Sequence, residues 1–246
     1  TIMFVSEMFY SVQGEGKRIG VPSYFLRLTG CNLHCGFDIE DLSKINQSNL
    51  EKYKVGEWIC DSVGVWKKGE KYSTNDIVSF LLKEREKYNY NNIVITGGEP
   101  LLQIEELKEM LYLIRHKKYR GTVEVETNGT LDPIRILGLV DNFNISPKLY
   151  LGKSNRWFGL NENWYPIENE KKVWKFVIAK EKDVDLVEQW AEDKHVDPST
   201  IYLMPASENR EELISNSLFV VEKAKELGFN FTTRLQIVIW DRLTGV

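Results

Sequence analysis

Short strand-like runs alternate with helix-like segments along most of this chain, and this order constrains the fold more than any other feature. Residues 1–11, 24–29, 92–96, 122–127, 143–145, 174–178, 201–204 and 231–240 are predicted strands. Predicted helices lie among them at 73–88, 105–118, 184–194 and 208–227, with a short one starting at Asp132-Pro133. Such βα units imply an α/β fold with a mostly parallel sheet, as an open or complete βα barrel.

Composition narrows the class of protein. The chain has 246 residues, of which 42% are hydrophobic and 28% charged, and its formal net charge is -4. These values are ordinary for a soluble globular protein, and they give no basic field that would attract nucleic acid. No apolar run reaches the ~20 residues of a membrane helix. Three cysteines do not suggest a disulfide framework, so we expect a reducing, cytoplasmic location.

The three cysteines are Cys31, Cys35 and Cys60. Taken singly, each is more simply explained as a small core residue. However, Cys31 and Cys35 flank a polar segment just after the predicted strand at 24–29, and a loop at a strand end is a good place for ligands. Three soft ligands suit an iron site that keeps one position open.

A glycine-rich turn, Thr96-Gly97-Gly98-Glu99-Pro100, follows another predicted strand directly and precedes a helix. Paired glycines let the backbone approach a ligand closely, and Glu99 could hold an ammonium group. Read alone, the turn is equally an ordinary strand-to-helix connection. Its place at the carboxyl end of a strand in a βα fold favours a binding site.

Seven motifs in order give the chain a family resemblance. They are Phe9 to Gly16, Arg27 to Leu33, Cys60-Asp61-Ser62, Thr96 to Pro100, Glu126 to Thr130, Ser146-Pro147-Lys148, and Arg234-Leu235-Gln236 before Trp240. Together they resemble the radical S-adenosylmethionine (SAM) enzymes and, within them, the 7-carboxy-7-deazaguanine synthases. The resemblance implies a partial, open βα barrel of the radical SAM type, with residues 1–246 forming one domain.

The chain departs from the family pattern at the cysteines. The usual pattern is Cys-x-x-x-Cys-x-x-Cys, but Asp38 stands at the third position, and a carboxylate poorly replaces a thiolate on iron. The usual continuation, Cys-Asp-Thr, returns as Cys60-Asp61-Ser62, so 24 residues separate Cys35 from Cys60 instead of two. We interpret residues 37–58 as an insertion with a helix at 41–53, which is tolerable because loop-closure cost rises slowly with length.

The resemblance implies a set of cofactor ligands. Cys31, Cys35 and Cys60 would hold a [4Fe-4S] cluster whose fourth iron is open to SAM. The predicted SAM-binding residues are Gly97, Gly98, Glu99, Thr127, Asn128, Ser146 and Lys148. Ser62 replaces the family's threonine ligand to Mg²⁺ with the same hydroxyl oxygen, supported by Asp61. Without the resemblance, Ser62 is equally a helix cap and Lys148 a solvated surface lysine.

The resemblance also implies a pterin substrate. Its predicted contacts are Gln13, Glu15, Arg27, Thr96, Gln236 and the terminal carboxylate of Val246. Gln and Glu can pair with amide-like edges, and Arg can clamp a carboxylate. Gln236 stands where many relatives carry histidine, so its role is left open. Without the resemblance, Gln13 to Gly16 is a turn and Arg27 an ion-paired surface residue.

The implied reaction converts 6-carboxy-5,6,7,8-tetrahydropterin to 7-carboxy-7-deazaguanine with loss of ammonia, in 7-deazapurine (queuosine-type) biosynthesis. The implied partners are the pterin, an electron donor such as a flavodoxin and a second copy of the chain, without direct binding of nucleic acid or membrane. Two alternatives remain: an activase for a glycyl-radical protein, and a non-catalytic module in which the cysteines and His34 bind zinc.

Overall fold

The computed structural model describes residues 1–39, 41, 44–45, 49–55, 58–60, 62–149, 159–243 and 245. In this part of the chain, nine strands form one sheet in the order β3-β1-β2-β4-β5-β6-β7-β8-β9. They are β1 (Ile2–Val12), β2 (Pro22–Leu28), β3 (Glu70–Ser73), β4 (Asn92–Gly97), β5 (Thr122–Thr127), β6 (Asn142–Ile145), β7 (Lys172–Ile178), β8 (Ile201–Pro205) and β9 (Asn230–Phe231).

Strand direction makes this an open, mostly parallel barrel. Neighbours from β2 to β9 run parallel, whereas β1 pairs antiparallel with both β2 and β3. Because β3 and β9 remain at the two edges, the sheet curves without closing. The predicted α/β class and partial βα barrel are therefore confirmed.

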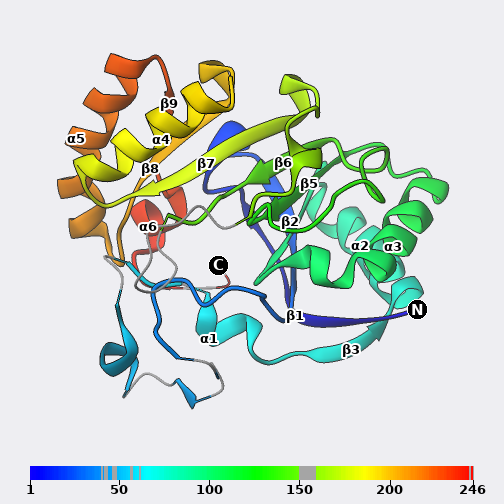
Figure 1. Cartoon of the computed structure of the whole chain (residues 1–246). Helices are drawn as coiled ribbons and strands as arrows, with labels where there is room; N and C mark the ends of the chain where they lie inside the picture. The colour runs from blue at the N-terminus through cyan, green and yellow to red at the C-terminus, as the bar shows by residue number, and fades with distance from the viewer. Residues whose placement is uncertain are drawn as a thin grey trace.

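The α-helices are α1 (Val63–Trp66), α2 (Thr74–Tyr88), α3 (Ile104–His116), α4 (Glu181–Asp193), α5 (Arg210–Leu227) and α6 (Leu235–Trp240). The 3₁₀ turns are η1 (Gly16–Arg18), η3 (Leu50–Tyr53), η4 (Pro100–Gln103), η5 (Glu162–Trp164), η6 (Asn169–Lys171) and η7 (Pro198–Thr200). Helices α2 to α5 lie outside the curve of the strands, whereas α6 lies on the inner side (Figure 1). No helix in the described ranges is both long and apolar enough to cross a membrane.

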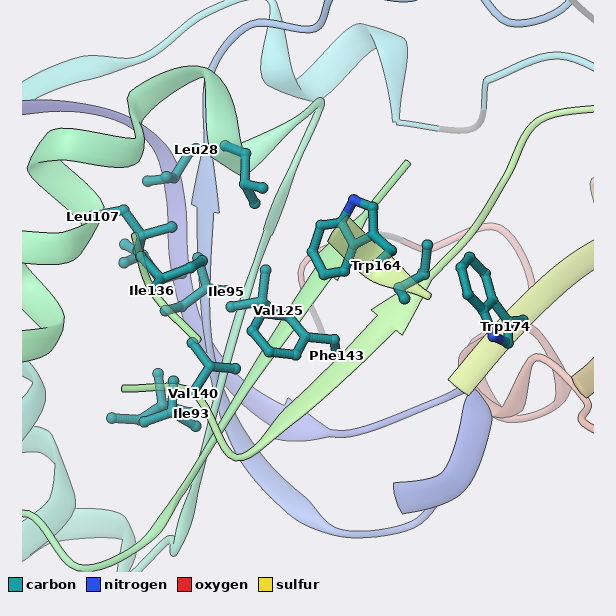
Figure 2. Packing of buried hydrophobic residues seen from close by; sticks show 14 of the residues in the cluster. Leu28, Ile93, Ile95, Leu107, Val125, Ile136, Val140, Phe143, Trp164 and Trp174 are labelled. Carbon is teal, nitrogen blue, oxygen red and sulfur yellow. The ribbon is translucent and has the colours of Figure 1, made fainter. Parts of the chain in front are cut away.

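Alternation along the strands separates an apolar outer face from a polar inner one. In β5, Val123 and Val125 join the main core, while Glu124 between them faces the other way. Figure 2 shows Leu107 of α3 beside the apolar side chains of the strands. Burying one such side chain contributes about 1.5–3 kcal/mol to the stability of the fold. Because this core lies on the outer face of the sheet, the polar side chains of the inner face are available for function.

Local capping explains where two of the predicted helices begin and end. The Ser73 hydroxyl accepts a hydrogen bond from the Asp76 amide at 3.0 Å and so caps the start of α2. Gly228 ends α5 in the left-handed conformation, with φ of 69°. Both boundaries agree with the sequence-based predictions.

Three local predictions are wrong in the described residues. The expected strand at 231–240 is β9 followed by α6, in which Ile237 packs inward while Val238 and Ile239 are exposed. The helix expected at Asp132-Pro133 is instead a series of turns. In the described residues of 41–53, Lys44 and the turn η3 have 3₁₀ conformation, and none of them is in the expected α-helix.

Candidate functional site

The ends of β2 and β4 bring the first cysteine loop against the glycine-rich turn. The Glu99 amide donates to the Gly30 carbonyl at 2.9 Å. A Cβ added at Gly98 would lie 2.2 Å from that oxygen and 2.7 Å from the Cβ of Cys31. Gly98 therefore has no room for a side chain, and the two loops are held in backbone contact.

Residues 37–58 fold back on themselves, so that Cys60 lies next to Cys35. The Asp38 amide donates to the Tyr53 carbonyl and the Val55 amide to the Gly36 carbonyl, each at 2.9 Å. This short antiparallel pairing closes the base of the insertion. Just beyond it, the Cys60 amide donates to the Cys35 carbonyl at 3.1 Å.

The cysteine loop fits an iron-sulfur cluster. The Cys31, Cys35 and Cys60 thiols lie close enough to influence one another electrostatically, and Cys31 and Cys60 contact a small apolar cluster made by Phe37, Ile45, Val63 and Trp66. Burial raises the pKa of the Cys31 thiol to about 11 and that of Cys35 to about 12. Three cysteine sulfurs are the ligands that such clusters use. The thiols are protonated in the free protein, and binding iron would remove these protons.

A compact zinc site is not found among the described residues. No group of three or more His, Cys, Asp or Glu side chains there is arranged to hold a metal ion, which needs sulfur ligands at about 2.3 Å in the case of zinc. The Nδ1 atom of His34 lies 2.8 Å from the Ile39 carbonyl instead. His34 is therefore held by a backbone carbonyl in this geometry.

Glu99 links the glycine turn to the end of β5. Its side chain is fully buried and accepts from the Leu101 amide at 3.0 Å, the Thr127 hydroxyl at 2.8 Å and the Asn128 amide at 2.7 Å. Burial raises the pKa of Glu99, although these hydrogen bonds and Lys148 oppose the shift. The carboxylate thus fixes the relative position of two predicted SAM-binding loops.

An amide cluster extends this connection to the cysteine loop. The Asn128 side chain donates to the Asn32 side chain at 3.0 Å, and Asn32 donates to the Thr130 hydroxyl at 2.8 Å. The Lys148 amine donates to the Ser146 hydroxyl at 2.9 Å, and its charge acts on Cys31 and Cys35. All seven residues predicted to bind SAM therefore lie either at the carboxyl ends of β4 and β5 or on the loops that follow β4, β5 and β6.

Below these loops, the inner face of the sheet carries a polar layer. Arg27 on β2 stands opposite Thr96 on β4, and the Thr96 hydroxyl donates to Glu126 on β5 at 2.8 Å. The Arg27 Nε atom also donates to Glu7 at 3.0 Å. The ion pair expected for Arg27 without the family resemblance is therefore present. Arg27 and Thr96 are thus neighbours, as a shared substrate site requires.

Glu15 is held by three side chains. It forms ion pairs with Lys175 of β7 and, at 3.3 Å, with Arg234, and it accepts from the Gln236 side chain at 2.7 Å. Burial alone would raise the pKa of Glu15, but the charges of Lys175 and Arg234 outweigh it and hold this pKa well below its ordinary value. Among the described residues, the buried Oε1 atom of Gln236 has no hydrogen-bond partner, and it lies against Gly14, where an added Cβ would come within 1.8 Å of it.

Gln13 lies in the same layer, and its side chain is 2% exposed. Its amide nitrogen donates to Glu124 and, at 3.3 Å, to Glu126. Its side-chain oxygen accepts from the Glu15 amide at 3.3 Å. Five of the six residues predicted to contact substrate thus belong to the polar layer at the inner face: two lie on β2 and β4, two follow β1, and one is in α6. Val246 lies outside the described residues, although the preceding Gly245 is near Glu7.

The predicted magnesium ligand lies beside the cysteines. The Ser62 hydroxyl is 3.6 Å from the Cys60 thiol, and it does not cap α1 through its side chain. Ser62 nevertheless stands at the N-cap position of α1, and its carbonyl accepts from the Val65 and Trp66 amides, so the helix-cap alternative holds for its backbone. Magnesium binding stays a prediction. Asp61 lies outside the described residues.

Comparison with known proteins agrees with this arrangement. Residues 12–136 match the family described as a 4Fe-4S single cluster domain. The 7-carboxy-7-deazaguanine synthase of Pyrobaculum aerophilum is 31% identical over 98% of this chain and 96% of its own length. The enzyme of the same name from Halobacterium salinarum is 28% identical, over 96% of this chain and 90% of that protein.

The chain belongs to the 7-carboxy-7-deazaguanine synthase family. The crystal structure of QueE from Escherichia coli shares the fold, with a TM-score of 0.64 over 95% of this chain and 94% of that one at 22% identity. Membership makes the protein a radical SAM lyase that uses a [4Fe-4S] cluster and SAM. It favours the synthase over the activase alternative.

Several residues of the inner face were given no site role by the sequence analysis, although Glu126 and Arg234 lie within two of its motifs. Glu124, Glu126, Asn144, Lys175 and Arg234 all join the polar layer. A usable signal was present in β5, since its sequence Thr-Val-Glu-Val-Glu-Thr alternates. Central parallel strands are usually apolar on both faces, so two carboxylates there indicate a polar interior.

Proposed function

We propose that this chain converts 6-carboxy-5,6,7,8-tetrahydropterin to 7-carboxy-7-deazaguanine with loss of ammonia, in 7-deazapurine biosynthesis of the queuosine type. The observation that carries the proposal is the position of the cysteine loop. Its three cysteines and the glycine turn stand at the strand ends directly above an inner face lined with polar side chains. A radical generated at the loops would therefore form next to a site able to bind a polar bicyclic ring.

In this proposal Cys31, Cys35 and Cys60 hold the cluster, and the loops ending β4, β5 and β6 hold SAM. The bound cluster and SAM supply the radical chemistry, and the chain supplies orientation and exclusion of water. Burial of Glu99, Thr127 and Asn128 keeps bulk water from the cofactor loops. Ser62 would contribute a hydroxyl ligand to Mg²⁺.

The substrate would occupy the inner face. Arg27 would bind its carboxylate, with Val246 as a further contact through the chain terminus. Gln13, Glu15 and Thr96 would read the polar ring edges by paired hydrogen bonds. The unpartnered Oε1 of Gln236 would accept from a ring N–H group. Residues 1–246 would act as one domain, interrupted by the 37–58 insertion.

The wider setting of the proposal follows the sequence-based predictions. An electron donor such as a flavodoxin would reduce the cluster, and two copies of the chain would form a homodimer. The enzyme would work in the cytoplasm, where the thiols stay reduced.

The test is an anaerobic turnover assay. The cluster is reconstituted to about four irons per chain, and SAM, Mg²⁺, dithionite and the pterin are added. Chromatography with mass spectrometry should show 7-carboxy-7-deazaguanine, with SAM recovered rather than consumed. A fully loaded enzyme that makes no such product contradicts the proposal, and stoichiometric consumption of SAM without the pterin would favour the activase.

A further inference from the structure

Glu124 is the most deeply buried carboxylate of the inner face, and none of the roles assigned so far uses it. Its side chain is fully inaccessible to solvent and projects from the middle of β5. A buried carboxylate is costly unless several groups bind it. The side chains that bind the Glu124 carboxylate therefore indicate its role.

Four side chains surround the Glu124 carboxylate. Oε1 accepts from the Gln13 amide and, at 2.7 Å, from the Asn144 amide. Oε2 accepts from the Asn142 amide at 3.3 Å and lies 3.6 Å from the Nε atom of Arg18. Asn142 and Asn144 come from the neighbouring strand β6, so two adjacent strands fix this carboxylate in place.

The bond to Gln13 decides which end of that amide faces the substrate. A primary amide has one donor end and one acceptor end, and it can turn around to exchange them. Glu124 and Glu126 both accept from the Gln13 nitrogen, so its oxygen points toward the Glu15 amide. Gln13 therefore presents an acceptor, and only one of its lone pairs is used by Glu15.

We propose that Glu124 is a positioning residue that sets the orientation of the Gln13 amide and thereby the recognition of the substrate ring. This inference rests on the proposed function, because it names how the same site selects its ligand. With Glu124 in place, Gln13 accepts a hydrogen bond from a ring N–H. Without it, only the two 3.3 Å bonds to Glu126 and the Glu15 amide oppose a turn of the Gln13 amide, which would offer N–H donors where the ring also carries donors.

The pKa of Glu124 depends on the charged groups around it. Burial, and next the charge of Glu126, raise the pKa of Glu124 to about 7, against the opposing effects of Gln13, Arg18 and Lys175. The charged and titratable groups that face it are thus Glu126 on the same strand, Arg18 from η1 and Lys175 from β7. A change in its charge would reach Gln13 directly through their hydrogen bond.

The variants to compare are Glu124→Gln and Glu124→Leu. Glutamine keeps one acceptor of the same shape but adds donors, and leucine removes both acceptors. Asp183→Asn is a matched control, because Asp183 is another fully buried carboxylate that accepts from the Ala179 and Lys180 amides at the start of α4. Asp183 is not among the residues proposed to bind the cofactors or the substrate.

Pterin affinity is measured by calorimetry on cluster-loaded protein with SAM but without reductant, so that no turnover is needed. We expect Glu124→Leu to weaken pterin binding about tenfold or more and Glu124→Gln to weaken it less, since an unmade buried hydrogen bond costs about 1–3 kcal/mol. SAM affinity and the spectrum of the cluster should not change. Asp183→Asn should leave pterin affinity at the wild-type value.

Each outcome separates the inference from the proposed function. If the loaded wild-type protein does not bind the pterin, the proposed function fails and the inference fails with it. If the wild type binds the pterin and Glu124→Leu binds it equally well, only the positioning role is overturned. Equal losses of pterin and SAM affinity in a folded Glu124→Leu variant would also overturn it, because they indicate a general structural role.

Discussion

The rim of the barrel and its inner face are held together by different kinds of contact. At the rim, the loops that carry Cys31, Gly98 and Asn128 are joined by backbone groups, by side-chain amides and by the single buried carboxylate of Glu99. On the inner face, charged side chains from distant strands bind one another, as Glu15 and Lys175 do. The rim therefore depends on exact backbone spacing, whereas the inner face depends on the balance of charge.

The first test breaks the rim at the third cysteine. Cys60→Ser should abolish cluster assembly and reduce product formation by about a thousandfold or more, because cluster and SAM carry the chemistry. Iron and sulfide content and the electron paramagnetic resonance spectrum report the loss. Asp38→Ala is the matched control, since Asp38 occupies the usual third-cysteine position and is expected to leave the cluster intact. Loss of the cluster in the control instead would make Asp38 the ligand.

The second test changes the spacing of the rim without removing a ligand. Gly98→Ala places a Cβ 2.2 Å from the Gly30 carbonyl oxygen, so the two loops must separate. We expect a stability loss of about 2 kcal/mol or more, together with lower cluster loading and SAM affinity. Urea unfolding and SAM titration measure these effects.

The control for spacing is Gly138→Ala, because an added Cβ there would have no neighbour within 4 Å. Its unfolding free energy should change by about 0.5 kcal/mol or less. If Gly98→Ala behaves like this control, the rim is less dependent on backbone contact than its geometry indicates.

The third test concerns charge on the inner face. Because the folded-state pKa of Glu124 is raised from 4.5 to about 7, the folded protein binds more protons than the unfolded chain between these values. This carboxylate's contribution to stability is therefore fully present below pH 4.5 and declines as pH rises through 7, by about 3 kcal/mol. Glu124→Gln removes that contribution.

The measurement is the unfolding free energy of the two proteins from pH 5 to pH 8. We expect the wild-type value to fall relative to that of Glu124→Gln as pH increases, while shared titrations cancel in the difference. A difference that does not vary with pH would mean that Glu124 has an ordinary pKa.

The smallest expected effect belongs to the amide cluster at the rim. Asn32→Ala removes the hydrogen bonds to Asn128 and Thr130, at a cost of about 1 kcal/mol. SAM affinity should fall about fivefold, because Asn128 is less well fixed. Asn169→Ala, which removes a bond to Asp197 on the surface, should not change SAM affinity. Equal SAM affinity in both variants would show that Asn128 is fixed without Asn32.

The sequence motifs predicted the rim and several polar residues of the inner face, but they did not predict which charged side chains pair there, for a physical reason. Cys31 and Cys35 lie in one short motif and the paired glycines in another, because cysteines serve as soft ligands and glycines let two loops approach closely. The partners of Glu15 are Lys175 and Arg234, far away in the chain, and only the folded sheet brings them together. Each alone is indistinguishable from a surface charge in the sequence.

Errors in the fold predictions have similar causes. Residues 231–240 are rich in β-branched side chains, which favour a strand, but after β9 the chain leaves the sheet edge and forms α6. There Arg234 donates to the Ser207 carbonyl at 2.7 Å, and this tertiary contact is invisible to local propensity. By contrast, α2 and α5 were predictable because Ser73 and Gly228 mark their ends.

The backbone pairing of residues 36–38 with 53–55 holds Cys35 close to Cys60. The number of residues between the two paired stretches therefore has little effect on the position of the cysteines. A fluorescent reporter or an affinity tag placed between the paired residues, but away from Ile45 in the apolar cluster at Cys31 and Cys60, could therefore be carried beside the cofactor of a working enzyme.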